Sequence, residues 1–232
     1  MRTKLVLGAV ILAAGLASSM AQVYSLNVVG YVNQTVQANH WYLLGNPLDL
    51  SAQGGTNTTT YVLSGLKSAS GNPDDWANSV VYGFTGGAYS GTADTYYAGF
   101  GWAPGTIDLT PGNGFFFQAG TNGTVTFVGQ VVTTNTFTLA GPNAWSLVSS
   151  AFPATNSLVA MGLAGNNNDL VYRYGDTAHP GGFNNGTTYY ASFGWADDEG
   201  SPVAGPTLNV GEAVFYQNNT AAVKWVQSFT IQ

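Results

Sequence analysis

The nine residues Thr95–Ala103, TYYAGFGWA, recur almost unchanged as Thr188–Ala196, TYYASFGWA. The two copies differ only where Ser192 replaces Gly99. Both copies are rich in aromatic residues and threonine and are interrupted by small residues, a composition typical of β-strands bounded by turns. A match of this length indicates that one structural unit occurs twice in the chain.

Four further blocks occur in the same order around both copies. Each block has four to ten residues and the same pattern of apolar positions. The pairs are Trp41–Leu44 with Trp145–Val148, Val81–Phe84 with Val171–Tyr174, Leu109–Gln118 with Leu208–Gln217, and Val125–Val128 with Val223–Val226. The repeat predicts two homologous domains, residues 22–138 and residues 139–232, with loops of different length between matching blocks.

The blocks predict β-strands throughout. They are rich in Val, Phe, Tyr and Thr, and clusters of Gly, Asn, Pro and Asp separate them. The runs Gly114–Gln118 and Ala213–Gln217 are apolar on both faces, which favours the central strand of a sandwich. We therefore expect an all-β fold of two tandem homologous β-sandwich or barrel-like domains that follow a cleaved signal peptide.

Residues 1–21 have the pattern of a signal peptide. Arg2 and Lys4 precede the apolar run Leu5–Ala17, and Ser19–Ala21 places small residues where a signal peptidase reads. We expect cleavage before Gln22 and a protein that is secreted, extracellular or on the cell surface, or in the periplasm. No later stretch approaches the roughly 20 apolar residues that a transmembrane helix needs.

Composition excludes several classes of function. The chain of 232 residues has 5 basic and 11 acidic side chains and a net charge of −6, so it cannot bind a nucleic-acid backbone electrostatically. It contains no cysteine, which excludes disulfides. At 45% hydrophobic and 13% aromatic residues it is too apolar to be disordered.

Two β segments lie outside the strongest repeats, Val23–Val32 and Val125–Leu139. In one interpretation each segment supplies the first strand of the domain that follows it, because neighbours in sequence usually pair. In the other, the N-terminal segment adds to an open sheet edge of a second subunit. The residues of that assembly strand would be Tyr24, Leu26, Val28, Val29 and Tyr31.

The sequence contains no recognisable catalytic motif. The two histidines, His40 and His179, fall at different places in the two copies, and no nucleophile motif or phosphate-binding glycine loop occurs. A pair of carboxylates facing a cleft would suffice for glycosidase chemistry. Most acids lie in turns, however, where Asp serves the backbone. We expect a protein that is not an enzyme and has no catalytic residues.

Asp197, Asp198 and Glu199 form the densest acidic group. Adjacent loop carboxylates can bind a hard cation such as calcium, and these three residues are the candidate metal ligands. The alternative is a solvated acidic turn, since the spacing matches no calcium-loop pattern. No other cofactor is expected.

The repeated aromatic residues are candidates for carbohydrate binding. Tyr97, Trp102, Tyr190 and Trp195 recur beside glycine, and exposed Tyr and Trp rings stack on sugar rings. The alternative is packing in the core, with alternation burying one tyrosine of each pair and exposing its neighbour. Trp41 and Trp145, two further aromatic residues that begin repeated strands, are expected in the core.

Three segments resemble a known family. The start Val23–Asn33 (VYSLNVVGYVN), then Leu43–Leu48 (LLGNPL) and Leu109–Gln118 (LTPGNGFFFQ), are similar to uncharacterised exported β-rich proteins of environmental Gram-negative bacteria. The resemblance covers nearly the whole chain after residue 21. It implies export and a β-rich fold, and it carries no activity, cofactor or catalytic residue with it.

These observations favour a secreted or cell-surface structural or adhesive protein. Low charge, many Gly, Asn, Thr and Tyr residues, and the additional N-terminal strand are compatible with self-association into filaments or an extracellular matrix through strand edges. The alternative is a non-catalytic carbohydrate-binding protein whose repeated Tyr and Trp platforms bind an extracellular polysaccharide.

Overall fold

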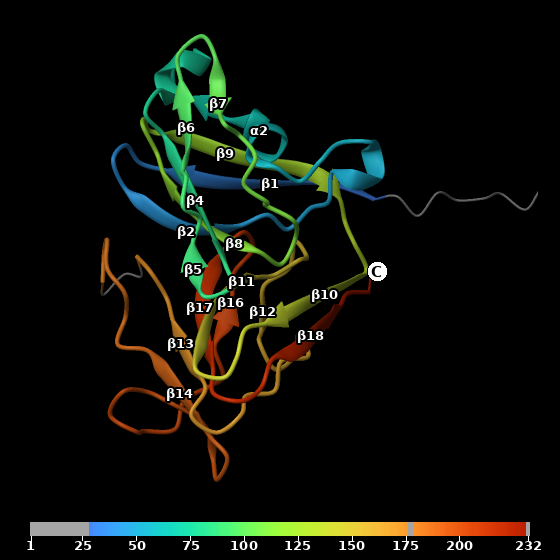
Figure 1. Cartoon of the computed structure of the whole chain (residues 1–232), viewed down its shortest axis with the longest axis vertical. Helices are drawn as coiled ribbons and strands as arrows, with labels where there is room; N and C mark the ends of the chain where they lie inside the picture. Colours follow the sequence, from blue (N-terminus) through green and yellow to red (C-terminus); the bar gives the residue numbers. More distant parts are fainter. Residues whose placement is uncertain (1–27, 176–178, 231–232) are drawn as a thin grey trace, which may run out of the picture.

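A computed structural model describes residues 28–175 and 179–230, and the fold is all-β with antiparallel sheets, as the sequence predicts. The described chain forms two halves arranged along its longest axis (Figure 1). The strands of the N-terminal half are β1 (Val29–Val36), β2 (Trp41–Gly45), β3 (Lys67–Ser68), β4 (Val80–Thr85), β5 (Ala88–Tyr89), β6 (Asp94–Tyr97), β7 (Gly101–Ala103), β8 (Gly114–Gln118) and β9 (Gly123–Gln130).

The C-terminal half repeats this order of strands. Its strands are β10 (Thr134–Leu139), β11 (Ala144–Ser149), β12 (Asn156–Ser157), β13 (Leu170–Tyr172), β14 (Thr187–Tyr190), β15 (Gly194–Ala196), β16 (Thr207–Leu208), β17 (Ala213–Asn218) and β18 (Val223–Ser228). The main sheet has the order β2-β8-β4-β6-β7 in the first half and β11-β17-β13-β14-β15 in the second. Each of these five strands therefore has a counterpart at the same place in the other sheet, and β5, which pairs with β4, is a sixth strand of the first sheet.

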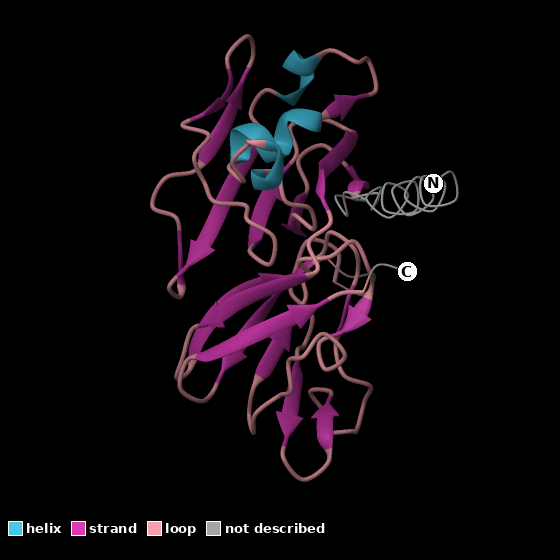
Figure 2. Cartoon of the chain, turned by 90° about the vertical axis from the view of Figure 1, so that its right-hand side faces the viewer, coloured by secondary structure: helices cyan, strands magenta, loops and turns pink. Residues whose placement is uncertain are grey.

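Within the part of the chain that the structure describes, helical structure is confined to short turns in the N-terminal half, drawn in cyan in Figure 2. These are the 3₁₀ turns η1 (Ser51–Gln53), η2 (Leu63–Gly65) and η3 (Pro73–Trp76) and the single α-helical turn α2 (Thr59–Val62). None of the helices in the described part of the chain has the length or the apolar character needed to cross a bilayer.

The first strand of each half pairs with the last strand of the same half. β1 is antiparallel to β9 along all of its residues, from Val29 opposite Gln130 to Val36 opposite Gly123, and β10 pairs with β18 in the same way. This pairing agrees with the interpretation in which each strand begins its own domain. β10 runs across residue 138, the boundary that the sequence repeat predicts. The expected signal peptide, residues 1–21, lies outside the described residues.

Each half has its own core, built from alternate residues of its strands. In the first half Phe115 and Phe117 of β8 point inward and pack with Trp76 and Phe127. In the second half Val214 and Tyr216 of β17 occupy the matching places, next to Trp225. The residue between each inward pair, Phe116 or Phe215, points to the opposite face of its sheet.

Those opposite faces pack against each other and form a third apolar cluster between the halves. It contains Leu43, Phe116, Leu147, Ala213 and Phe215. Leu43 is the counterpart of Leu147, and Phe116 is the counterpart of Phe215. The interface therefore has the character of a symmetric dimer interface, in which one surface meets a copy of itself.

Reciprocal backbone contacts confirm this symmetry. The amide of Gly45 donates to the carbonyl of Gly211 at 3.0 Å, and the amide of Ser149, the counterpart of Gly45, donates to Gly112 at 2.9 Å. A Cβ atom placed on Gly45 would lie 2.1 Å from the Cβ of Ser149. Glycine at residue 45 is therefore required for the approach of the two sheets.

We predict that Gly45→Ala lowers the free energy of unfolding by about 1–3 kcal/mol, because the added methyl group collides with Ser149 across the interface. The double variant Gly45→Ala with Ser149→Gly exchanges which half carries the side chain and should recover most of the loss. Urea denaturation of the two variants checks this. A double variant as unstable as the single one would contradict the assigned contact.

Candidate functional site

Ten aromatic residues surround the junction between the halves, and they form five pairs of counterparts. We call them the aromatic cluster. The pairs are Trp41 and Trp145, Tyr82 and Tyr172, Phe84 and Tyr174, Tyr89 and Phe183, and Phe116 and Phe215. Tyr89 and Phe183 match because each lies opposite its partner, Phe84 or Tyr174, in a short antiparallel pairing.

The ring positions repeat closely across the interface. The ring centroids of Phe84 and Tyr89 are 5.1 Å apart, and those of Tyr174 and Phe183 are also 5.1 Å apart. Tyr89 lies 5.7 Å from Phe116, and Phe183 lies 5.7 Å from Phe215. Across the interface, the distances from Tyr89 to Phe215 and from Phe183 to Phe116 are both 6.4 Å.

The N-terminal half extends an arm onto the other half, and Tyr174 and Phe183 of the C-terminal half make the matching contacts. In the N-terminal half the arm is the β4–β5 hairpin, whose turn at Gly86 and Gly87 has φ values of 63° and 84°, which only glycine adopts readily. This hairpin lies at the junction in Figure 1 and brings Phe84 within 5.0 Å of Phe215, centroid to centroid. The matching contact places Tyr174 5.4 Å from Phe116. The cluster is therefore assembled from both halves.

Two grooves open in the aromatic cluster. Groove A has a volume of about 380 Å³ and is lined by Trp41, Tyr82, Tyr89, Phe116 and Tyr174. Groove B has a volume of about 540 Å³ and is lined by Phe84, Gly87, Ala88, Tyr89, Trp145, Tyr172, Phe183 and Phe215. The five residues of groove A are the counterparts of Trp145, Tyr172, Phe183, Phe215 and Phe84 in groove B. Tyr89 lines both grooves.

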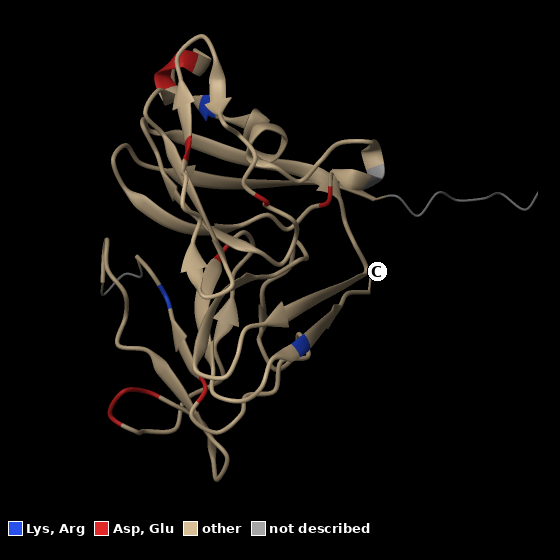
Figure 3. Ribbon diagram, viewed as in Figure 1, with Lys and Arg blue, Asp and Glu red and all other residues tan. Residues whose placement is uncertain are grey.

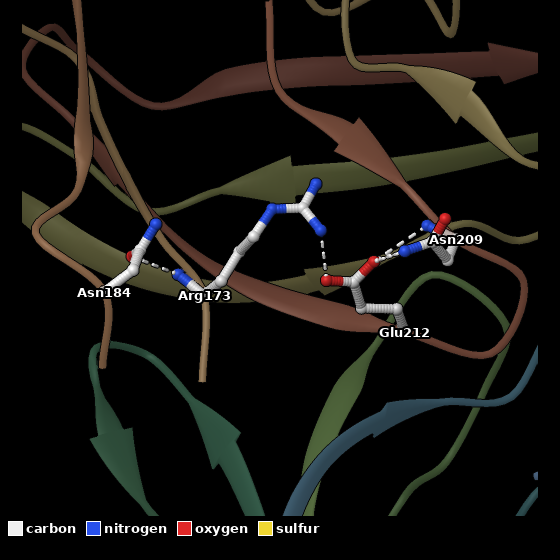
Figure 4. A network of polar contacts seen from close by, with 4 residues as sticks. All are labelled: Arg173, Asn184, Asn209 and Glu212. Carbon is white, nitrogen blue, oxygen red and sulfur yellow. Dashed lines mark hydrogen bonds and ion pairs between the residues drawn. The ribbon is translucent and has the colours of Figure 1, made fainter. Parts of the chain in front are cut away.

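Among the described residues, 28–175 and 179–230, no charged side chain lines either groove. The nearest cation in sequence, Arg173, stands between Tyr172 and Tyr174 and is paired with Glu212 at 2.5 Å (Figure 4). The other oxygen of Glu212 accepts hydrogen bonds from the backbone and side chain of Asn209. Burial raises the pKa of Tyr89, and the nearby Tyr174 raises it further, so its hydroxyl stays neutral. The grooves offer ring faces and neutral hydroxyls.

The predicted carbohydrate platforms are only partly at the surface. Trp102 and Trp195 are 9% and 4% exposed and contact Tyr96 and Tyr189 edge to face in the two cores. These indoles are therefore core residues, which corrects the expectation that they stack on sugars. Their inward orientation follows from alternation along β7 and β15.

The tyrosines of the same repeats do lie at the surface. Tyr97 is exposed, and Tyr190 is half-buried and stacks on Phe193 with ring centroids 5.0 Å apart. Phe100, at the turn of the β6–β7 hairpin, is 91% exposed. The structure places these residues in hairpins away from the junction, so it does not bring the two predicted patches together.

Trp41 and Trp145 are not core residues of either half. Both are half-buried at the junction and line grooves A and B respectively. The four other tryptophans of the chain, Trp76, Trp102, Trp195 and Trp225, are buried in the two cores. The sequence could have located the grooves from Phe116 and Phe215, since a strand that is apolar on both faces must be covered on both.

The acidic group Asp197–Glu199 forms a turn. Asp197 Oδ1 accepts hydrogen bonds from the backbone amides of Glu199 and Ser201. In the described residues no three His, Cys, Asp or Glu side chains converge on a point where a metal ion could bind. The three candidate ligands thus correspond to the alternative of a solvated turn. In Figure 3 this loop and the η3 turn mark opposite ends of the molecule in red.

Acidic side chains elsewhere hold the backbone in place. The fully buried Asp94 accepts hydrogen bonds from the amides of Gly105 and Ile107, at 2.8 and 2.9 Å. The fully buried Asp169 accepts from the amide of Asn219 and from the hydroxyl of Tyr216. These carboxylates stabilise loops and do not face either groove.

The assembly residues lie at the start of β1. Val28 and Val29 are exposed and Tyr31 is 72% exposed, while Tyr24 and Leu26 lie outside the described residues. β1 is an edge strand, since its sheet has the order β1-β9-β3. One side of β1 is therefore used within the chain, and the other is the side on which a further strand could add.

Comparison of the chain with protein-family models, with curated proteins and with solved structures found no match. The function must therefore be inferred from the residues themselves.

We predict that Trp195→Phe lowers the free energy of unfolding by about 1–3 kcal/mol, because a smaller ring leaves a cavity beside Tyr189. Among the described residues the buried indole nitrogen has no hydrogen-bond partner, so its loss offsets part of this cost. Tyr97→Ala, at an exposed ring, should leave stability almost unchanged. Thermal denaturation of both variants compares them, and equal losses would argue against the core assignment.

Proposed function

We propose that the protein is an exported, non-catalytic protein that binds an uncharged carbohydrate in grooves A and B. The observation that carries the proposal is the pair of equivalent grooves, each walled by a tryptophan, tyrosines and phenylalanines from both halves. The sequence analysis gives carbohydrate binding as an alternative, with Tyr97, Trp102, Tyr190 and Trp195 as the binding residues. The grooves suggest other residues for the same function: Trp41, Tyr82, Tyr89, Trp145 and Tyr172.

The chemistry of the grooves supports a neutral sugar ligand. Sugar rings present apolar C–H faces that stack on aromatic rings, and their hydroxyls bond to neutral donors and acceptors such as tyrosine hydroxyls. Among the lining residues that the structure describes, an anionic ligand would find no cation and a cationic ligand would find no carboxylate. Two grooves on one chain would also gain affinity for a long polymer through effective concentration.

The proposal includes the absence of catalysis. A hydrolase would need an acid and a base or nucleophile at the ligand. No described lining residue of either groove is Asp, Glu or His. His40 lies at an exposed turn, where its Nδ1 contacts the carbonyl of Ala38 at 2.9 Å. Tyrosine and tryptophan supply stacking and hydrogen bonds without a group that titrates near neutral pH.

We predict that Tyr89→Ala weakens binding of a neutral polysaccharide about tenfold, because Tyr89 lines both grooves and each lost stacking contact is worth on the order of 1 kcal/mol. Affinity electrophoresis in gels that contain xylan, mixed-linkage β-glucan or galactomannan measures the effect. Tyr61→Ala is the matched control, since Tyr61 is an exposed tyrosine that lines neither groove. Retardation of wild type in none of these gels, or equal retardation of both variants, would contradict the proposal.

Self-association remains a second candidate function, and the edge position of β1 favours it. β1 has the sequence VGYVNQTV, with no charge and no proline, and it offers a long strand edge without the features that usually block pairing. A second copy could add a strand at this edge and extend the sheet into a filament or matrix.

We expect Tyr31→Lys to reduce any polymer, because a lysine on an edge strand opposes the addition of a further strand. Light scattering and negative-stain imaging of wild type and variant test this. The control is Thr136→Lys, at an exposed residue of β10 in the C-terminal half. Polymers that persist in Tyr31→Lys and disappear in Thr136→Lys would place the contact elsewhere.

A further inference from the structure

Grooves A and B have the same plan, and they differ at the positions where a hydroxyl would stand. Groove A has tyrosine at residues 82, 89 and 174. In groove B the counterpart of Tyr174 is Phe84 and the counterpart of Tyr89 is Phe183, so among the five matched positions only Tyr172 keeps its hydroxyl. Tyr89 itself also lines groove B, so groove B has two tyrosine hydroxyls where groove A has three.

The size and the additional lining residues of groove B also favour an apolar ligand. Its volume is about 540 Å³, compared with about 380 Å³ for groove A, and Gly87 and Ala88 of the β4–β5 hairpin add small uncharged residues to its wall. Its rings meet at steep angles, 86° between Phe84 and Phe215 and 88° between Trp145 and Phe215, and the rings of groove A are also steeply inclined, for example 76° between Trp41 and Phe116. Walls of this kind present both faces and edges to an inserted ring, the geometry that aromatic pairs prefer.

We propose that groove B binds an uncharged aromatic ring, carried by the same ligand whose sugar lies in groove A. The ligand class is then a neutral glycan or glycoside that bears an aryl group. The sugar half of this inference rests on the proposed function, whereas the aryl half rests on the lining of groove B alone. Tyr89 links the two, because its ring forms a wall of both grooves and is 49% exposed between them.

Polar satisfaction explains why a sugar alone would prefer groove A. A sugar hydroxyl that enters a groove loses water and must find a partner, or binding is weakened. Groove A supplies three phenol hydroxyls, of which Tyr174 already donates to the carbonyl of Gly181 at 3.0 Å and can still accept. An aryl group has no such requirement and gains from each ring it contacts in groove B.

The experiment uses residues 22–232 of the chain and three probes that share one sugar. These are the methyl, phenyl and octyl β-glucosides, and titration calorimetry gives their dissociation constants. We expect the phenyl glucoside to bind about tenfold more tightly than the methyl glucoside. An octyl glucoside that binds as tightly as the phenyl glucoside would overturn the inference, since groove B would then accept any apolar group.

A charge placed in groove B tests the location. Ala88→Asp introduces a carboxylate at an exposed residue that lines groove B only, and it should abolish the tenfold advantage of the phenyl glucoside. Ala98→Asp is the matched control, because Ala98 is an exposed alanine in the β6–β7 hairpin, away from both grooves. An advantage that survives Ala88→Asp would place the aryl group elsewhere and overturn the inference.

Tryptophan fluorescence reports each groove separately. Trp41 and Trp145 are the half-buried tryptophans, one in each groove, and the other four are buried. The phenyl glucoside should change the emission of Trp145, so its response in Trp41→Phe should persist and exceed that of methyl glucoside. In Trp145→Phe the phenyl and methyl glucosides should give the same response, which comes from Trp41. A phenyl-specific response that depends on Trp41 instead would assign the ring to groove A and contradict the inference.

The same titrations separate failure of the inference from failure of the proposed function. Methyl glucoside that changes the emission of Trp41, combined with no advantage for the phenyl compound, supports sugar binding and overturns the aryl site. Phenyl binding that depends on Trp145 and Ala88, combined with no response to methyl glucoside, supports the aryl site and counts against sugar binding.

Discussion

The close approach of β2 and β11 at Gly45 and Ser149 is the constraint on which the rest of the structure depends. A glycine at residue 45 lets the two main sheets meet, and the two reciprocal amide-to-carbonyl bonds to Gly211 and Gly112 fix their relative orientation. Once this orientation is set, Phe116 lies next to Phe215, and the β4–β5 hairpin reaches the C-terminal half. The grooves are consequences of this one contact.

The first strands of the two halves reinforce the same arrangement. The side-chain amide of Gln34 in β1 donates to the carbonyl of Val210 in the C-terminal half at 2.6 Å, and Asn135 in β10 donates to Pro111 in the N-terminal half at 3.1 Å. Half-buried amide donors of this kind favour one relative position of the halves over others, because a shift would break these hydrogen bonds. Apolar packing alone would be less selective.

Much of the fold could be predicted from the sequence, whereas the candidate site could not. The repeat TYYAxFGWA and its flanking blocks predict strands that the structure contains. Alternation along β8 also predicts that Phe115 and Phe117 lie on one face of the sheet and Phe116 on the other. Which surface covers Phe116 depends on residues of the other half, which lie far away in sequence. Phe183, for example, is 67 positions from Phe116, and their ring centroids are 6.4 Å apart. For the same reason the sequence predicts that Trp41 lies in the core of its own half, whereas the structure places it half-buried at the junction.

The short connection Val131–Thr133 between β9 and β10 has a consequence for dilution. A dimer of separate subunits would lose any site built from both partners once its concentration fell below the dissociation constant. Here three residues hold the halves together, and a short linker sustains an effective concentration in the millimolar range. The composite grooves therefore persist however few molecules are present, and each half is free to diverge in sequence without the requirement to recognise itself.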